Sequence, residues 1–321
     1  MEFNKSNYIV DSYSENVYKV AIITGASRSG KTILGLELAR GKYVDHLEDD
    51  WINIILTVSS GLGKIDSTFA KQLLCSYTNE KVNDAVLLRN ANFRPEDQTS
   101  IWKLKDPEDI FRRLLVVKSR KDVTEFLTDN DYLLLLNLPT ILPFVHFLFD
   151  VYLGLKVIHV VRNGISVAKE IEKKEWWSDE SLNLRRVSTL YRTVKINGNM
   201  VNIPWWVHEG EEKFFSELDG FSRGLYSWVM NFDFNGKNSN DNYQNKYIKI
   251  IRFEDLLGNN TRKIFEDACD YLSISDQFQM EESVARLKNI KMTVTERGNL
   301  DIVPDELKRR VMPWLEKFGY I

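Results

Sequence analysis

The stretch that decides the fold is "AIITGASRSGKTILGLELAR", residues 21–40. A strand is predicted before its glycine-rich turn, over Val20 to Thr24, and an amphipathic helix after it, over Ile33 to Arg40. The turn matches G-x-x-x-x-G-K-[ST] at every fixed position. Glycines let several backbone N–H groups point inward, and the helix adds its positive N-terminal end. A phosphate-type ligand is therefore predicted at Gly25, Ala26, Ser27, Arg28, Ser29, Gly30, Lys31 and Thr32.

The composition describes a globular chain without a strong net charge. The 321 residues are 43% hydrophobic, which is ample for the core of one large α/β domain or two small ones. Because no internal repeat or break in composition marks a boundary, a single domain over residues 1–321 is predicted. The 43 basic and 46 acidic residues give a formal charge of −3, which excludes a global positive field for nucleic acid or an anionic membrane.

The cysteines and the N-terminal segment bear on the compartment. Cys75 and Cys269 lie far apart and without metal-ligand spacing, which suits a reducing compartment and argues against a disulfide framework or a zinc site. The segment "MEFNKSNYIVDSYSEN" has no signal-peptide core, and no run of 18 apolar residues occurs in the sequence. A soluble, cytoplasmic protein without a membrane span is expected.

Five short apolar segments, rich in β-branched or aromatic residues, are predicted to be buried strands. They are Tyr18 to Thr24, Ile52 to Val58, Tyr132 to Asn137, Val157 to Val161 and Tyr247 to Phe253. Helix-length segments separate them, which favours an α/β fold with a central parallel sheet of about five strands flanked by helices. Ligands of such sheets bind at the carboxyl ends of the strands, where the glycine-rich turn lies.

Three further segments are predicted to lie outside this scaffold. Residues 59–67, "SSGLGKIDS", form a small-residue loop after the second predicted strand. Asn197-Gly198 stands between two alternating runs, which is the strongest short hairpin signal and places a flap or hairpin insertion around residues 178–210. Residues 233–246 are polar, as is typical of an exposed loop.

A second anion site is predicted after the fourth strand. In "KVIHVVRNGISVAKEIEKK", Arg162 stands at the carboxyl end of the strand, just before an Asn163-Gly164 turn and another helix. The planar guanidinium suits a bidentate grip on a phosphate. By itself such an arginine is more often an ion-pair partner, but the glycine-rich turn on the same sheet edge favours the phosphate interpretation.

These features occur in the order found in sulfotransferases. The glycine-rich turn, "VIHVVRNGISVA", "YIKIIRFEDLL" with its helix "TRKIFEDACDYLSI", and the terminal "LEKFGY" carry the likeness. The chain resembles the sulfotransferases that use 3′-phosphoadenosine 5′-phosphosulfate (PAPS), including the bacterial members and the tyrosylprotein branch, from about residue 18 to residue 320. The resemblance implies a P-loop-like fold in which the first turn grips the 5′-phosphosulfate and Arg162 grips the 3′-phosphate. The product would be 3′-phosphoadenosine 5′-phosphate (PAP), and the chemistry requires no metal.

Within the turn, the resemblance gives individual residues their roles. Arg28 takes the place of the basic residue beside the leaving group, while Ser29, Gly30 and Thr32 match the family. Lys31 replaces a threonine of the family, and this replacement completes a nucleoside-triphosphate motif.

The second anion site departs from the family. Glu170 stands eight residues after Arg162, where a serine usually helps to bind the 3′-phosphate. Because a carboxylate would repel a phosphate, either Ser166, one turn earlier, substitutes, or the phosphate is held differently. Arg297 and Gly298 in "TERGN" partly match the family's closing basic-glycine segment.

The acceptor must lose a proton as it attacks, so a base is expected beside it. The tyrosylprotein branch carries a glutamate between its second and third strands, and the matching region here, "LLRNANFRPEDQTSIW", offers Glu96 and Asp97. The alternative is that "RPED" merely starts a helix, with Pro95 in the first turn. His208 is the reserve candidate. Arg28 and Lys31 would neutralise the charge that grows on the leaving phosphate.

The other histidines and the paired tryptophans have plainer interpretations. His146 and His159 lie in apolar segments and are expected in the core, while His46, in "DHLEDD", is expected on the surface. Two tryptophan pairs, Trp176-Trp177 and Trp205-Trp206, fit flap packing and an acceptor wall equally well.

The hypothesis is a transfer of sulfonate from PAPS to a hydroxyl or amine of a small-molecule or saccharide acceptor, with the oligomeric state open. The alternative is a P-loop kinase or NTPase in which Lys31 and Thr32 serve ATP and magnesium. Such a protein needs an acidic residue at the end of an apolar strand. Asp150 in "VHFLFD" imitates this residue, but apolar residues continue back to Ile141 at helical spacing, which predicts a helix.

Overall fold

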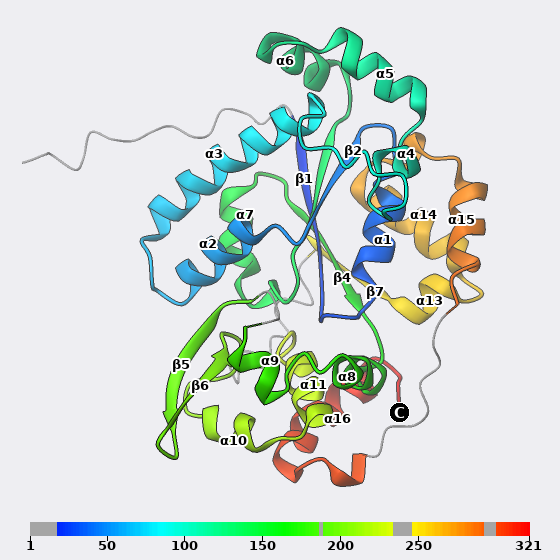
Figure 1. The fold of residues 1–321 in the computed structure, drawn as a ribbon. Coiled ribbons are helices and arrows are strands. Elements are labelled where there is room, and N and C mark those ends of the chain that lie inside the picture. The colour runs from blue at the N-terminus through cyan, green and yellow to red at the C-terminus, as the bar shows by residue number, and fades with distance from the viewer. Residues whose placement is uncertain (1–17, 186–188, 234–245, 292–299) are drawn as a thin grey trace, which may run out of the picture.

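The computed structural model describes residues 18–185, 189–233, 246–291 and 300–321. Its centre is a parallel sheet of five strands in the order β2-β3-β1-β4-β7 (Figure 1). The strands are β1 (Lys19–Thr24), β2 (Val44–Glu48), β3 (Leu133–Asn137), β4 (Lys156–Val161) and β7 (Ile248–Arg252). The predicted α/β fold with a five-stranded parallel sheet is confirmed.

Helices cover both faces of the sheet, because the strands are apolar on both sides (Figure 1). Ile22 and Leu134 face a core shared with α2 (Trp51–Gly61), α3 (Ser67–Val86) and α7 (Val145–Val151). Ile23 and Leu135, one residue further along each strand, face a core shared with α1 (Lys31–Leu38), α14 (Thr261–Leu272) and α15 (Met280–Lys288). This alternation is the two-residue period of a strand.

A further group of elements lies beyond the carboxyl ends of the strands (Figure 1). It comprises α8 (Gly164–Lys173), α9 (Asp179–Asn183), β5 (Tyr191–Ile196), β6 (Asn199–Pro204), α10 (Glu212–Glu217), α11 (Gly220–Val229) and α16 (Asp305–Lys317). Figure 1 shows α4 (Ile101–Leu104), α5 (Pro107–Val116) and α6 (Arg120–Asp129) near the opposite end of the sheet, and α13 (Phe253–Leu257) directly follows β7. Short 3₁₀ turns cover Leu142–Phe144, Ser275–Gln277 and Leu300–Ile302.

The predicted hairpin is confirmed. β5 and β6 pair antiparallel in a sheet of their own, outside the central one. Asn197 and Gly198 connect them with φ of 49° and 87°, as a turn with two left-handed residues requires. The interpretation of residues 1–321 as a single domain stays a prediction.

The second predicted strand is wrong. Ile52 to Val58 lies within α2, whose first turn is capped because the Asp50 side chain accepts a hydrogen bond from the Asn53 N–H. Ile54 and Val58, four residues apart, are its buried apolar positions. The true second strand is β2, an edge strand of sequence VDHLE. The loop predicted at residues 59–67 is therefore the connection between α2 and α3.

Asp150 lies in helix α7. The prediction that Asp150 belongs to a helix, and is not an acid at the end of a strand, is therefore confirmed. Most of the loop expected at residues 233–246 lies outside the described residues, as do Arg297 and Gly298. No helix within the described ranges is long and apolar enough to cross a membrane.

Candidate functional site

The turn between β1 and α1 has a backbone that requires its glycines. Gly25 has φ of 141°, and a Cβ there would lie 2.3 Å from the Val160 carbonyl oxygen. Gly30 has φ of 93°, and a Cβ there would lie 2.2 Å from the Phe253 ring. At both positions φ is positive, and a neighbouring atom lies where the Cβ of any other residue would be. Only glycine fits there. The turn is thus fixed in the concave form that phosphate cradles use.

Lys31 and Ser29 are buried within this turn. Lys31 is 6% exposed, and its amine donates a hydrogen bond to the Ala26 carbonyl oxygen at 2.8 Å. Burial lowers the pKa of Lys31 to about 8, although Asp49 and Glu48 oppose the shift. Ser29 is 1% exposed, and its hydroxyl oxygen has no hydrogen-bond partner in the described chain. Because this hydroxyl has almost no accessible surface, a phosphate-binding role for Ser29 stays a prediction.

The predicted strand–arginine–turn–helix unit is present beside this turn. Arg162 follows β4, which pairs with β1, so the two turns lie at neighbouring strand ends. The Arg162 guanidinium donates to the Arg28 carbonyl oxygen at 3.0 Å and lies 5.5 Å from the Phe253 ring centre. Asn163 caps α8 by accepting hydrogen bonds from Ile165 N and Ser166 N.

Glu170 contacts the first turn as well. Its carboxylate lies 3.2 Å from the Arg28 guanidinium, which also lies 5.9 Å from the Trp176 ring centre. The Glu170 side chain is 15% exposed, whereas that of Arg28 is 39% exposed. Glu170, which stands where sulfotransferases usually have a serine, therefore partly neutralises the positive charge of Arg28.

Both turns open into one cavity of about 870 Å³. Its basic side chains are Arg28, Lys31, Arg40, Lys103, Arg162 and Arg286. Trp176, Phe253, Leu36 and Ile290 supply apolar surface, and Glu48 and Asp49 stand where the cavity meets the end of β2. Such a cavity can hold a ligand with two separated anionic groups and a planar apolar part.

Glu48 is a site residue that the sequence analysis missed. Its Oε1 accepts hydrogen bonds from the Thr32 hydroxyl at 2.6 Å and from the Asn137 amide at 2.8 Å. Its Oε2 is buried, lies 3.4 Å from His46 Nε2, and accepts no hydrogen bond within the part of the chain that the structure describes. Thr32 and Asn137 thus orient the carboxylate, whose side chain is 29% exposed and can take a proton.

The sequence analysis missed Glu48 because it placed the second strand at the wrong residues. With the strand placed at Ile52 to Val58, "HLEDD" fell within a connection rather than at a strand's carboxyl end. The signal that could have found it is the alternation in VDHLE followed by Asp50, a helix-capping residue. The same error put His46 on the surface, whereas its side chain is 3% exposed and packs against Gly35.

The structure does not bring the predicted bases to the cavity. Glu96 lies exposed in a turn, where its carbonyl oxygen accepts from the Lys103 amine, and Asp97 accepts from Asn92. The alternative that a helix starts at Pro95 is also wrong, because α4 begins only at Ile101. His208 lies beside α11: its N–H donates to the Tyr226 hydroxyl, and its Nε2 is 3.2 Å from the Asp233 carbonyl oxygen.

The aromatic residues divide between packing and the cavity. Trp177, Trp205 and Trp206 are at most 6% exposed and belong to the core, and they also line a small cavity of about 40 Å³ that includes Ser27 of the turn. Trp176 lines the cavity. His159 is buried in β4 as expected, and burial lowers its pKa to about 3. His146 is exposed, which corrects the expectation that it lies in the core.

Comparisons with known proteins give matches among solved structures alone. No family model and no curated protein matches the chain. The sulfotransferase domain of the Synechococcus PCC 7002 olefin synthase is 15% identical, with 94% of this chain and 95% of that domain covered and a TM-score of 0.44. Sulfotransferase STF9 from Mycobacterium avium is 12% identical, with 96% and 78% covered and a TM-score of 0.47. The chain is similar to sulfotransferases.

A third solved structure with such a likeness is retinol dehydratase in complex with androsterone and the inactive cofactor PAP. It is 12% identical, with 93% of this chain and 80% of that chain covered and a TM-score of 0.34. Likenesses of this size do not determine what this chain binds, so a function must be argued from its own cavity.

Proposed function

We propose that this chain is a sulfotransferase that moves a sulfonate group from PAPS to a hydroxyl or amine of a small-molecule or saccharide acceptor. The observation that carries the proposal is the meeting of two anion-binding turns in one cavity. Arg162, after β4, donates a hydrogen bond to the backbone of Arg28 in the turn after β1. A donor with phosphates at both its 3′ and 5′ positions needs two such sites side by side.

The residues present fit this donor. Gly25 and Gly30 hold the turn at positive φ, a backbone form in which consecutive N–H groups can point toward phosphate oxygens. Lys31 and the backbone N–H of Thr32 would hold the 5′ end, with the Lys31 amine turning from the Ala26 carbonyl to the phosphate, while the Thr32 hydroxyl stays hydrogen-bonded to Glu48. Arg162 would hold the 3′-phosphate. Ser166 N–H is already bonded to Asn163, and we propose no more than a supporting role for Ser166.

The ion pair with Arg28 explains how the Glu170 carboxylate can lie near the bound 3′-phosphate. Because Glu170 pairs with Arg28, its charge is directed at a guanidinium rather than at the bound anion. When the donor binds, Arg28 would keep this ion pair and contact the leaving phosphate through its other N–H groups. Arg297 and Gly298, outside the described residues, stay predicted contributors to the donor site.

The chemistry asks the protein to position two partners and to stabilise charge. PAPS supplies the sulfonate, which leaves a phosphate oxygen and bonds to the acceptor oxygen or nitrogen. Arg28 and Lys31 stabilise the charge that the departing phosphate gains. We assign the acceptor's proton to the Glu48 carboxylate, since this side chain lines the cavity, is 29% exposed and is held in place by Thr32 and Asn137. Glu96, Asp97 and His208 lose this role because they do not line the cavity.

One observation favours the kinase alternative. The Thr32 hydroxyl and the Glu48 carboxylate are hydrogen-bonded at 2.6 Å, and in ATP-using P-loop enzymes a hydroxyl and an acid at this place serve magnesium. The strand next to β1 on that side, β3, ends in Asn137, whose amide is neutral. An enzyme of this type would use ATP with magnesium at the same turn.

The experiment compares PAP without metal and ATP with magnesium, by calorimetry and by thermal unfolding of the full chain. PAP is expected to bind without metal and to raise the melting temperature more than ATP with magnesium at equal concentration, since a ligand at 100 times its Kd adds about 2.7 kcal/mol to stability. Arg162→Ala should weaken PAP binding by about 2–4 kcal/mol, because a charge-assisted contact to the 3′-phosphate is lost. If ATP with magnesium alone stabilises the chain, the kinase assignment replaces this one.

We further propose that the protein works in the cytoplasm. The two cysteines form no disulfide within the described part of the chain, which suits a reducing compartment. The net charge of −3 makes nucleic acid an unfavourable partner.

A further inference from the structure

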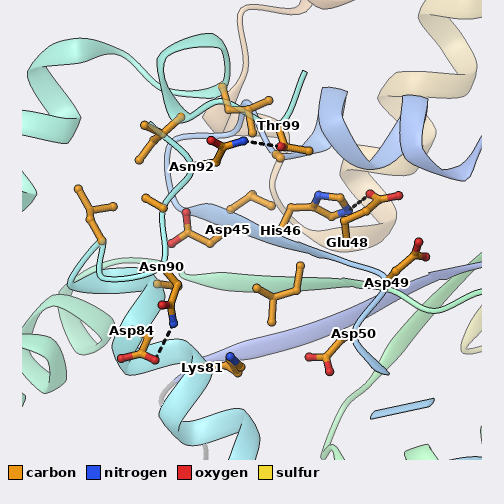
Figure 2. Close-up of a pocket in the computed structure, with 18 of the residues that line it drawn as sticks. Asp45, His46, Glu48, Asp49, Asp50, Lys81, Asp84, Asn90, Asn92 and Thr99 are labelled. Atoms are coloured by element: carbon orange, nitrogen blue, oxygen red, sulfur yellow. Dashed lines mark hydrogen bonds and ion pairs between the residues drawn. The ribbon is translucent and has the colours of Figure 1, made fainter. Parts of the chain in front are cut away.

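A second cavity, of about 520 Å³, adjoins the donor cavity at the end of β2. The two cavities share Glu48, Asp49, Trp51 and Leu104 in their walls. Figure 2 shows side chains entering this second cavity from β2 and the residues after it, from α3 and from the loop that follows α3. A molecule lying in the second cavity would therefore reach the proposed base, Glu48, from the side opposite to the donor.

The walls combine apolar surface with an excess of carboxylates. Apolar side chains include Val44, Ile52, Leu88, Ile101 and Leu104. Asp45 is already paired, since its carboxylate lies 2.7 Å from Arg113 and 3.9 Å from Lys105. The carboxylates of Glu48 and Asp49 interact with the Lys31 ammonium of the donor cavity. Those of Asp50 and Asp84 remain against one further ammonium group in this wall, that of Lys81 (Figure 2).

Asp50 provides an observation independent of this charge count. The residue is 6% exposed, and its Oδ1 accepts hydrogen bonds from Asn53 N at 3.3 Å and from the Tyr77 hydroxyl at 3.0 Å. Its Oδ2 is buried in the cavity wall and has no hydrogen-bond partner among the described residues. A buried carboxylate oxygen without a donor is costly, and a ligand that brings an N–H donor removes the cost.

Asp84 lies on the α3 side of the same cavity. It accepts a hydrogen bond from the Asn90 amide at 2.8 Å (Figure 2). Its nearest cation, Arg89, is 3.7 Å away, and the Arg89 side chain is 59% exposed. Such an exposed pair neutralises the carboxylate only weakly. The field inside the cavity is therefore negative at both its β2 and α3 walls.

We propose that this cavity is the acceptor subsite and that the acceptor is a hydroxyl compound carrying a protonated amine on an apolar body. The inference rests on the proposed sulfonate transfer. The hydroxyl would lie at Glu48, and the ammonium would bind at Asp50 and Asp84. In the transfer, the acceptor O–S bond forms while the S–O bond to the 5′-phosphate of PAPS breaks. The electron pair of that bond stays on the phosphate, and the hydroxyl proton goes to Glu48.

The test uses three phenols that differ at one group: tyramine, 4-propylphenol and 3-(4-hydroxyphenyl)propionate. Their charges are positive, neutral and negative at neutral pH. We expect tyramine to bind the full chain at least 10-fold more tightly than 4-propylphenol in calorimetry, and the propionate not to bind, because only the ammonium complements the carboxylates.

Asp50→Asn is the variant that isolates the charge, because asparagine is as good a helix cap as aspartate and should keep α2 folded. It is expected to reduce the preference for tyramine over 4-propylphenol at least 10-fold and to leave 4-propylphenol binding unchanged. Asp66→Asn is the matched control, since Asp66 caps α3 through Phe69 N but does not line the cavity. It should leave the preference intact.

PAP binding, measured on the same protein samples, separates this inference from the proposed function. If PAP binds and tyramine shows no preference, or none of the phenols binds, the acceptor assignment is overturned and the sulfotransferase proposal stands. If tyramine binds with the expected preference but PAP does not bind, the amine site stands and the donor assignment fails. A preference that Asp50→Asn leaves unchanged would also overturn the assignment of the ammonium to Asp50.

Discussion

At the scale of single residues, the proposed donor turn depends on a lysine whose pKa burial has lowered. Lys31 is enclosed by its own turn, and burial lowers the pKa of its amine from 10.5 to about 8. A phosphate binds the protonated amine better than the neutral one. The same amine in the unfolded chain holds its proton to higher pH.

The affinity for PAP is therefore expected to fall as the pH rises through about 8, by up to tenfold per pH unit, measured by calorimetry between pH 7 and pH 10. Lys31→Arg should bind PAP with a flat profile, because a guanidinium keeps its charge in this range. The amine's contribution to stability has the opposite sign: the unfolded state binds more protons between the two pKa values, so this contribution rises with pH. A binding loss that follows unfolding instead would contradict the assignment.

Glu48 is the second residue on which the chemistry depends. Glu48→Gln keeps the hydrogen-bonding shape toward Thr32 and Asn137 but cannot take a proton. PAP formation from PAPS with a phenolic acceptor should fall about 100-fold or more, while PAP affinity stays near that of the unchanged protein. Glu96→Gln is the matched control and should retain most of its turnover. The opposite pattern would return the base to the exposed turn at Glu96.

At the scale of elements, the second anion turn is held by the contact between α8 and α11. A Cβ at Gly164 would lie 2.7 Å from the Trp228 ring, and one at Gly224 would lie 2.7 Å from Ala168 Cα. The Trp228 indole N–H also donates to the Arg162 carbonyl oxygen at 3.0 Å. Close packing of the two helices thus places the arginine.

Gly224→Ala is expected to lower the free energy of unfolding by about 1–3 kcal/mol through overpacking, measured in urea, and to weaken PAP binding as α8 shifts. Gly220→Ala, in the first turn of the same helix, is the control. A Cβ there would lie 3.4 Å from Glu172 Cγ, which is ordinary contact. This control should be neutral or stabilise the protein by up to about 1 kcal/mol. Equal losses from the two variants would show that the α8–α11 contact does not place Arg162.

At the scale of the whole molecule, hydrogen bonds connect the C-terminal segment to the turn that follows β4. The Tyr320 hydroxyl donates to Glu254 Oε2 at 2.8 Å, and the other oxygen of Glu254 accepts from Asn163 N at 2.9 Å. The segment after α16, the helix α13 and the turn after β4 are thereby joined. The Tyr320 hydroxyl also lies 3.4 Å from the Val161 carbonyl oxygen.

Tyr320→Phe should cost about 1 kcal/mol of unfolding free energy and weaken PAP binding several-fold, because Glu254 loses a donor beside the anion turn. Tyr271→Phe offers a comparison on the same strand, since the Tyr271 hydroxyl lies 3.4 Å from the Val157 carbonyl oxygen near the opposite end of β4. It should change stability without changing PAP affinity. A loss of PAP affinity in both variants would point to a general loosening of β4.

Local patterns in the sequence determined the scaffold. The G-x-x-x-x-G-K-[ST] turn, the apolar strands around it, the Asn197-Gly198 hairpin and the strand–arginine–turn unit at Arg162 all follow from interactions between near neighbours in the chain. Each has a backbone or period that its residue types prescribe. The position of β2 did not follow, because an edge strand with three charged or polar residues lacks the apolar run of a central strand.

Contacts between distant residues decided the candidate chemistry. Glu48 joins the site because β2 pairs with β3, which brings its carboxylate to Thr32 and Asn137. Glu170 meets Arg28 across 142 positions of the chain. No local pattern encodes such meetings, since they depend on strand order and on which helix faces which turn. The sequence by itself therefore determined the two turns at which anions are proposed to bind, and only the tertiary structure decided which carboxylates face those turns.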